Sequence, residues 1–154
     1  IHDLNTVVLR FANLYGPYGK GYQEFGFINY FIHLAWTNQD IKIFGSGDQT
    51  RNVLYVEDAV DILWRAAHEP SLVGESWFAT SDQHLAVREI AEKIVQVFQR
   101  GRVTYIEWPD ERKRIEIDHV IFSSDRLRSI VDWTPRHDLE SGLLRIRSIL
   151  EQLG

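Results

Sequence analysis

The 154-residue sequence contains no cysteine. It therefore carries neither a disulfide framework nor a thiolate nucleophile, which is compatible with the reducing cytoplasm where we expect the protein to reside. No apolar run is long enough to span a membrane and no signal peptide is visible, so we expect no membrane partner. The 22 Asp and Glu outnumber the 17 Lys and Arg, and this net charge of −5 argues against a general nucleic-acid binder.

Several catalytic motifs are missing as well. Gly45 and Gly47 begin a G-x-G pattern, but Thr50 stands where a dinucleotide-binding turn needs its third glycine. No tyrosine is followed four residues later by lysine, an arrangement in which the ammonium lowers the phenol pKa. The six histidines lack metal-ligand spacing and no serine lies in a nucleophile elbow. We therefore expect no metal site and no catalytic residues in this chain.

Methionine is also absent, and the sequence begins with Ile1. Residues 5–11 predict a strand, and the unbroken apolar run of Val7, Val8 and Leu9 is typical of a strand buried on both faces of a parallel sheet. Such a strand needs neighbours on each side, and few residues precede it. We expect residues 1–154 to be the C-terminal part of a larger α/β protein.

What the sequence does contain is an alternation of strand and helix patterns, which is typical of the α/β class. Helices are predicted over residues 27–36, 59–67, 87–98, 123–131 and from 139 onward, and further strands over 41–44, 53–56, 76–80 and 103–107. The helix at 59–67 is nearly all apolar, so we expect it to lie between two layers. Asp138 is expected to cap the last helix.

Residues 45–58 organise the rest of the chain. A glycine-bearing turn leads into the apolar strand at 53–56, and Glu57 and Asp58 open the next helix, where acidic side chains suit the helix dipole. Arg51 precedes the strand, and its guanidinium can fork onto a phosphate or a carboxylate with two hydrogen bonds. From the residues alone, an internal ion pair with a nearby acid is the simpler interpretation.

Two loops leave alternatives open. Residues 13–21 are rich in glycine, proline and aromatics and follow a strand, which is where ligands bind in open α/β sheets, but a plain surface loop has the same composition. Residues 110–118 place three consecutive cations between acids, which is also the pattern of a solvated loop.

Three motifs occur together in one order. Residues 9–17 read LRFANLYGP, residues 43–47 and 51–58 read IFGSG and RNVLYVED, and residues 123–135 contain SSDRL and DWTP. This set resembles the C-terminal half of the extended short-chain dehydrogenase/reductase family, in particular the NAD-dependent nucleotide-sugar epimerases and dehydratases. Asn52 departs from the pattern, because the family usually has Asp there. Four further departures lie near the end: Ser123, Asp125, Arg126 and Asp132.

The resemblance implies a substrate site. It assigns Asn13 to the sugar nucleotide, Ile43 and Phe44 to the base pocket, and Arg51 to the diphosphate, which reverses the interpretation of Arg51 from the residues alone. A second diphosphate cation would be one of three neighbouring residues: Arg112, Lys113 and Arg114.

It also implies a cofactor and a place in a larger fold. Tyr15, Gly16 and Pro17 would lie near the nicotinamide of NAD, which would be bound mainly by an absent N-terminal dinucleotide-binding part. Residues 1–154 would then comprise the last strands of a Rossmann-type sheet and the small mixed α/β substrate-binding domain. The full protein would oxidise and re-reduce C4 of a UDP- or dTDP-hexose, and this part alone would be inactive.

Two alternatives from other classes remain. The first alternative is a non-catalytic nucleotide-binding relative of the same fold. The second is an interaction module that packs on a partner through an exposed sheet edge. The expected partners are a nucleotide sugar, the missing N-terminal half or a second copy of the chain. The full-length protein is expected to form a homodimer.

Overall fold

The computed structural model describes residues 4–153 and shows an α/β protein. Its strands are β1 (Val8–Phe11), β2 (Asn13–Tyr15), β3 (Ile41–Phe44), β4 (Thr50–Tyr55), β5 (Ser76–Ala79), β6 (His84–Ala86), β7 (Val103–Ile106) and β8 (His119–Val120). Its α-helices are α1 (Phe27–Trp36), α2 (Val56–Ala66), α3 (Val87–Phe98), α4 (Asp110–Lys113), α5 (Asp125–Arg128) and α6 (Leu139–Leu153). Two short 3-10 helices lie at Gln23–Phe25 and Pro70–Leu72.

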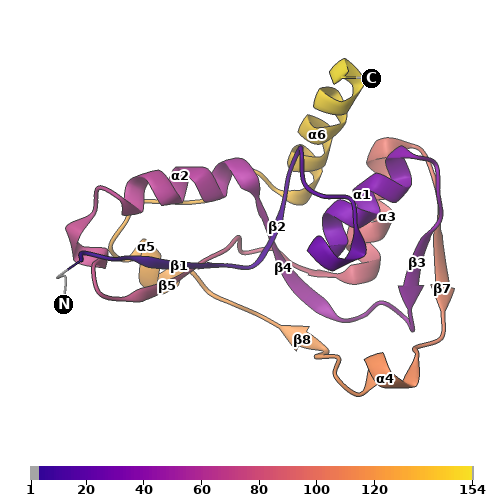
Figure 1. The fold of residues 1–154 in the computed structure, drawn as a ribbon, viewed down its shortest axis with the longest axis horizontal. Helices are drawn as coiled ribbons and strands as arrows, with labels where there is room; N and C mark the ends of the chain where they lie inside the picture. Colours follow the sequence, from indigo (N-terminus) through magenta and orange to yellow (C-terminus); the bar gives the residue numbers. More distant parts are fainter. Residues whose placement is uncertain (1–3, 154) are drawn as a thin grey trace.

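The strands form small sheets whose members come from distant parts of the chain. β1 pairs with β5, β3 with β7, and β2 with β4, all in parallel. β4 also pairs with β6 in antiparallel and with β8 in parallel, so it is the strand that joins most of the others. In Figure 1, β4 runs between the side that carries β1, β5 and α2 and the side that carries α1, α3, β3 and β7.

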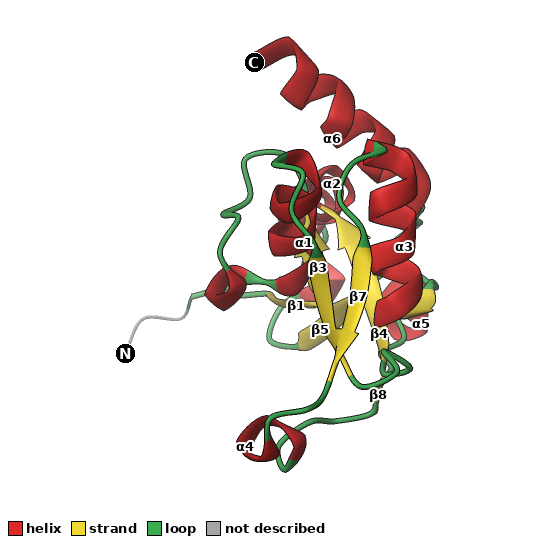
Figure 2. Cartoon of the chain, turned by 90° about the vertical axis from the view of Figure 1, so that its right-hand side faces the viewer, coloured by secondary structure: helices red, strands yellow, loops and turns green. Residues whose placement is uncertain are grey.

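One hydrophobic core surrounds α3, and we call it the α3 cluster. α1, α3 and α6 contribute apolar side chains that are fully buried, because each helix repeats apolar residues at helical spacing. Ile90 and Ile94 of α3 and Leu143 of α6 are 0% exposed. Gly142 lets α6 approach this closely, because a Cβ at that position would collide with the Tyr15 hydroxyl. Figure 2 shows α3 beside β7, with α4 below the strands.

A second core lies under α2, and we call it the α2 cluster. It contains Ile62 of α2, Trp77 of β5 and Leu127 of α5, with Leu9 and Phe11 of β1 packed against it. Asp58 ties α2 to the start of α6, because its buried carboxylate accepts the backbone N–H groups of residues 136 and 137, each at 3.0 Å.

The sequence predicted several elements correctly. α1, α3 and β3 have the predicted bounds, and β3 alternates as expected, with Ile41 and Ile43 buried. The Asp138 carboxylate accepts the backbone N–H of Ser141 at 2.8 Å, which confirms it as the cap of α6.

No helix among residues 4–153 is both long and apolar enough to cross a membrane.

Other boundaries were wrong. The strand predicted at 5–11 begins at Val8, and the chain bends at Ala12 to form β2, because β1 and β2 have different partners, β5 and β4. The strand predicted at 53–56 begins at Thr50 and ends at Tyr55, and Val56 already belongs to α2. The predicted helix at 123–131 shortens to α5. Residues 110–118 hold α4, where only a loop was predicted.

Two elements that were expected to be covered on both faces within a larger protein each have an open face in this chain. α2 is amphipathic rather than enclosed, because Val60, Leu63 and Trp64 are 50% or more exposed along its outer face. β1 is covered on one face by the α2 cluster, but Val8 and Arg10 on the other face are exposed. In Figure 1, α2 and β1 lie at the same end of the molecule as β5, and their open faces point away from the α2 cluster that lies between them.

Candidate functional site

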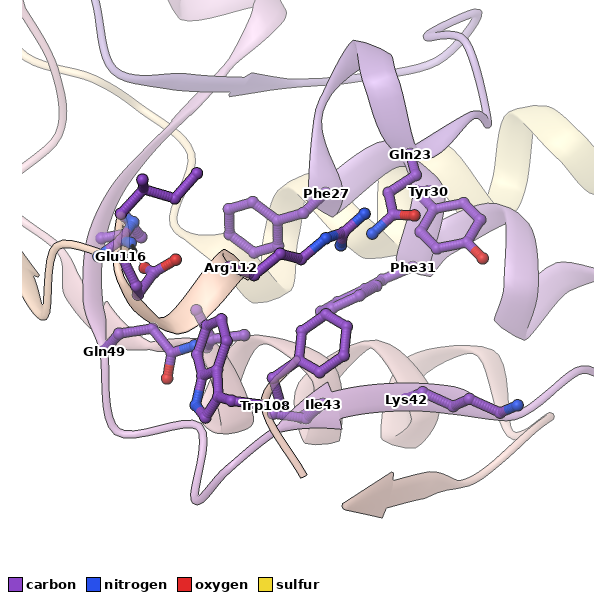
Figure 3. A pocket seen from close by; sticks show the side chains of 14 residues that line it. Gln23, Phe27, Tyr30, Phe31, Lys42, Ile43, Gln49, Trp108, Arg112 and Glu116 are labelled. Atoms are coloured by element: carbon purple, nitrogen blue, oxygen red, sulfur yellow. Dashed lines mark hydrogen bonds and ion pairs between the residues drawn. The ribbon is translucent and has the colours of Figure 1, made fainter. Parts of the chain in front are cut away.

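A cavity of about 320 Å³ lies where the end of β3 meets the start of β4 and the segment around α4. Figure 3 shows its aromatic and charged side chains converging from these elements and from α1. Its lining is Gln23, Phe27, Tyr30, Phe31, Lys42, Ile43, Phe44, Gln49, Arg51, Val87, Trp108, Arg112, Ile115 and Glu116. Three cations therefore line the cavity against one acid, in a chain whose net charge is negative. This balance favours an anionic ligand with an apolar part.

One wall of the cavity is an aromatic stack. The rings of Phe44 and Trp108 lie 5.1 Å apart in a stacked arrangement, and the Arg112 guanidinium lies 5.4 Å from the centre of the Phe44 ring. In Figure 3, Arg112 extends into the space between Phe27 and Phe31. Gly45 makes room for the stack, because it has a φ of 62° and a Cβ there would strike the indole nitrogen of Trp108. Flat apolar faces beside a guanidinium suit a planar aromatic ligand group.

Arg51 is held by its own chain. Its Nη1 donates to the carbonyl oxygens of Thr50 at 2.9 Å and Asp118 at 3.3 Å, and its Nη2 forms an ion pair with Glu116. The side chains of Arg51 and Glu116 are 16% and 26% exposed. The internal ion pair suggested by the residues alone is therefore present. A phosphate oxygen has the same charge and acceptor character as the Glu116 carboxylate, so it could take the same place.

Residues 112–122 form a strap beside this cavity. Arg112, Ile115 and Glu116 of the strap line it, and Lys113 lines a neighbouring cavity of about 350 Å³ together with Trp108 and Glu116. The strap is joined to β4 through β8, in a register that sets Thr50 beside His119 and Arg51 beside Val120. The backbone N–H of Thr50 also donates to the backbone oxygen of Asp118 at 2.8 Å.

Three comparisons with known proteins point to one family. The model of the NAD dependent epimerase/dehydratase family matches residues 2–77. The UDP-N-acetyl-alpha-D-glucosaminuronate decarboxylase of Bacillus cytotoxicus is 33% identical over 63% of this chain and 30% of its own length. The UDP-glucose 4-epimerase of Mycolicibacterium smegmatis is 26% identical over 94% of this chain and 45% of its own. The structure of Thermotoga maritima UDP-glucose 4-epimerase with UDP-glucose matches 98% of this chain and 48% of its own, with 23% identity and a TM-score of 0.85.

The chain belongs to the NAD-dependent epimerase/dehydratase family. The family predicted from the sequence motifs and the α/β fold class are thereby confirmed. The chain spans less than half the length of each of these three proteins.

The structure brings four of the predicted substrate residues of this family member together. Ile43, Phe44, Arg51 and Arg112 line the same cavity. Of the three competing cations, Arg112 reaches this cavity and Lys113 reaches its neighbour. Arg114 is exposed at the end of α4 and lines neither.

Asn13 lies in a different place. It lines a shallow cavity of about 340 Å³ formed by residues 11–14 and 25–28, and Phe27 is shared between this cavity and the cationic one. Its side-chain nitrogen donates to the backbone oxygen of Asn52 at 2.9 Å. The predicted sugar contact and the predicted diphosphate contact are therefore neighbours across Phe27.

The predicted cofactor residues lie at the end of β2. The Tyr15 ring is 1% exposed inside the α3 cluster, and its hydroxyl donates to the backbone oxygen of Asp138 at 3.1 Å. Burial, reinforced by the negative charge of Asp138, raises the pKa of the Tyr15 phenol well above its usual value. Tyr15 is thus a protonated core residue, and any contact with a cofactor would come from the backbone of the turn at Gly16 and Pro17.

Trp108, Glu116 and the two glutamines of the cavity were missed by sequence reasoning. Trp108 follows β7, which pairs in parallel with β3, so both strands end at the same edge. That rule would have placed Trp108 beside Phe44 if the pairing of β3 with β7 had been known.

Among residues 4–153, no group of three or more His, Cys, Asp or Glu side chains is arranged to hold a metal ion.

Proposed function

We propose that this chain is the nucleotide-sugar-binding part of an NAD-dependent epimerase or dehydratase acting on a UDP- or dTDP-hexose. The observation that carries the proposal is the convergence of Arg51 and Arg112 on an aromatic cavity that also contains Ile43 and Phe44. A nucleoside diphosphate combines a planar base with two adjacent negative charges, and it matches the two halves of this lining. The names of the matched proteins support the same ligand class, because they act on UDP-sugars.

In this proposal each group has a separate task. The base lies against the wall of Phe44 and Trp108, which is apolar and flat. Arg51 and Arg112 neutralise the diphosphate, and Glu116 gives up its ion pair with Arg51 when the ligand arrives. Asn13 contacts the hexose beyond Phe27. The chain thereby supplies orientation and charge neutralisation to a reaction whose acid and base lie elsewhere in the protein.

NAD, the cofactor that the family name implies, fits this chain only at an edge. Tyr15 is buried, so the turn at Gly16 and Pro17 offers a backbone wall and no cradle for a dinucleotide. When bound, NAD supplies reversible acceptance of a hydride from C4 of the sugar. The residues of this chain hold the hexose in position beside it.

We further propose that a dinucleotide-binding part of the same protein covers β1 and α2. The support is two exposed surfaces on opposite sides of the α2 cluster: the outer face of α2, with Leu63 50% and Trp64 69% exposed, and the open face of β1. Parallel strands are ordinarily covered on both faces, so these surfaces favour a packing partner. The same surfaces are what favours the alternative of an interaction module. We propose that the whole protein is a cytoplasmic homodimer.

Calorimetric titration of UDP-glucose into the whole protein tests the nucleotide-sugar site. Arg51→Ala is expected to weaken binding by roughly 1.5–3 kcal/mol, the range for a hydrogen bond to a charged group. Arg51→Lys should restore only part of this, because lysine lacks the planar fork. Arg102→Ala is the control, since Arg102 is 76% exposed and pairs with Asp40 away from the cavity. Equal affinities for wild type and Arg51→Ala would reject the assignment.

A further inference from the structure

We propose that Asn52 is a positioning residue of this site, an inference that rests on the proposed function. Its side-chain amide holds the strap against β4 and so keeps Glu116 and Arg112 in the wall of the cavity, although Asn52 does not line the cavity itself. Asn52 would therefore set the affinity for a nucleoside diphosphate without touching it.

The contacts of Asn52 show what its amide does. The side chain is buried in the middle of β4, where the residue is 1% exposed. Its Oδ1 accepts the backbone N–H of Phe122 at 2.8 Å, and its Nδ2 donates to the backbone oxygen of the same residue at 3.3 Å. The amide thus satisfies both polar groups of one residue of the strap, as a neighbouring strand would. Nδ2 also donates to the backbone oxygen of Ser81 at 3.1 Å.

This clamp acts where backbone pairing stops. β8 is only two residues long, and its pairing with β4 ends at Arg51 and Val120. The backbone of Asn52 is engaged with His84 of β6 on the other side of β4. The side chain of Asn52 therefore continues the attachment of the strap beyond the end of β8.

The strap has little else to hold it. Ile115, Ile117 and Ile121 are each more than half exposed, so apolar packing contributes little to its position. Its other attachments are short polar contacts and one aromatic stack. Asp118 contacts Thr50 and Arg51, Glu116 pairs with Arg51, His119 bonds the Thr50 hydroxyl at 3.1 Å, and β8 pairs with β4 over two residues. The Phe122 ring stacks on Phe78 with ring centres 4.7 Å apart. Releasing Phe122 from Asn52 would remove the anchor on the far side of β8. Residues 112–118, which include the cavity-lining part of the strap, would then depend on the two-residue pairing of β8 and on the contacts of Glu116 and Asp118.

The chemistry requires an amide at this position. Two of the three partner atoms are carbonyl oxygens, which need a donor, and the third is an N–H, which needs an acceptor. A carboxylate would accept from Phe122 but would place negative charge against the two carbonyl oxygens. This explains why this chain has Asn at a position where the sequence resemblance leads one to expect Asp.

The test compares Asn52→Asp with Asn38→Asp in the whole protein. Both substitutions add one negative charge, but Asn38 is exposed and uses only its Oδ1, which accepts from the Gly101 N–H at 3.0 Å and can do so equally as a carboxylate. Hydrogen exchange of residues 115–122 without ligand reports the strap, and calorimetry with UDP-glucose reports the site. For Asn52→Asp we expect about tenfold faster exchange in the strap and about tenfold weaker binding, in line with the loss of a buried hydrogen-bond pair. Asn38→Asp should change neither.

A pH profile separates positioning from general destabilisation. Burial raises the pKa of a carboxyl group introduced at position 52, so this group takes up a proton as the pH falls and regains one donor. Asn52→Asp should therefore recover part of its strap protection and affinity between pH 8 and pH 5.5. Wild type and Asn38→Asp should show no such recovery.

A second pair of variants covers the case in which Asn52→Asp does not fold. Phe122→Pro removes the N–H that Asn52 accepts, whereas Phe122→Ala removes the ring but keeps the N–H. The proline variant should bind UDP-glucose several-fold more weakly than the alanine variant, because only it breaks the clamp.

The outcomes distinguish this inference from the proposed function. Faster exchange spread evenly over the chain, or equal behaviour of Asn52→Asp and Asn38→Asp, would overturn the role of Asn52. Equal affinity of the two Phe122 variants would overturn it as well. If the wild type itself failed to bind UDP-glucose, the proposed function would fall, while the exchange comparison would still decide whether Asn52 holds the strap.

Discussion

The α3 cluster and the α2 cluster differ in how completely the chain covers them. Around α3, three helices and the strands β2 and β3 enclose side chains such as Ile90 and Ile94, which are 0% exposed. Around α2, the inner face is equally buried, because the side chains of Ile62 and Leu72 are 0% exposed, but the outer face exposes Trp64. The chain therefore completes the core beside its cavity by itself and leaves the other core with an open side.

This difference separates two roles of the chain. The cationic cavity draws on α1, β3, β4 and α3, elements that belong mainly to the closed side, so its geometry is set by residues present here. The open side offers apolar surface and a strand edge, which suit contact with more protein. The proposed ligand site and the proposed partner surface therefore lie on opposite sides of β4.

The largest expected effect concerns activity. Residues 1–154 alone should show no epimerase or dehydratase turnover with NAD and UDP-glucose, because the described residues hold binding groups and no acid/base pair for the sugar. An assay of the purified chain beside the whole protein provides the measurement. Turnover by the chain alone would show that the division of roles drawn above is wrong.

The next prediction concerns the open side in solution. The isolated chain should self-associate, because every ~200 Å² of apolar surface removed from water is worth about 5 kcal/mol before the costs of association. Light scattering across a tenfold dilution measures this. Replacing Leu63 and Trp64 by lysine should reduce the association, whereas lysine at the exposed Gln96 of α3 should not. A chain that stays monomeric at every concentration contradicts the prediction.

Core truncation sharpens the comparison further. Ile90→Ala should lower the free energy of unfolding by about 2–5 kcal/mol, because it leaves a cavity in a fully enclosed core. Trp64→Ala should change it by less than about 0.5 kcal/mol in the isolated chain, since Trp64 is exposed there. Urea unfolding at low protein concentration gives both values. In the whole protein the cost of Trp64→Ala should rise to about 3 kcal/mol or more if the missing part covers this face.

The smallest effect lies at the cap of α6. Hydrogen bonds from the Ser141 hydroxyl and backbone N–H lower the pKa of Asp138. A lowered folded-state pKa means that this contribution is present above the unfolded pKa and is lost as the pH falls through the folded value. Asp138→Ala should therefore cost about 1 kcal/mol at pH 7, the usual contribution of an N-cap, and progressively less as the pH falls below the ordinary pKa of an aspartate. A cost that stayed constant with pH would contradict this origin.

The sequence predicts best where the signal is local. α1 and α3 were predicted to the residue, because their apolar positions repeat at helical spacing over three turns. β6 and β8 escaped prediction, since strands of three and two residues exist only because β4 lies beside them. The apolar residues Val60, Leu63 and Trp64 predict that α2 needs cover on its outer face, but composition alone does not say what covers them.

In the candidate site, too, the residues marked by local motifs were predicted and those that depend on distant strand pairing were not. Ile43, Phe44, Arg51 and Arg112 were chosen through resemblance and do meet in one cavity. Glu116 was missed because its ion pair with Arg51 depends on the register of β8 on β4, which no local pattern encodes.

The strand pairing also implies an order of assembly. Within residues 4–153, every strand pair joins segments separated by at least one helix or another strand, so each closes a long loop before it gains a contact. β4 is made before its neighbour β8, which emerges from the ribosome only after β7 and α4. A growing chain that stops short of Glu116 contains Arg51 without the ion-pair partner Glu116 and without the carbonyl oxygen of Asp118. The cavity therefore forms only after residues 112–116 have been made, although β3 and β4 are made long before them.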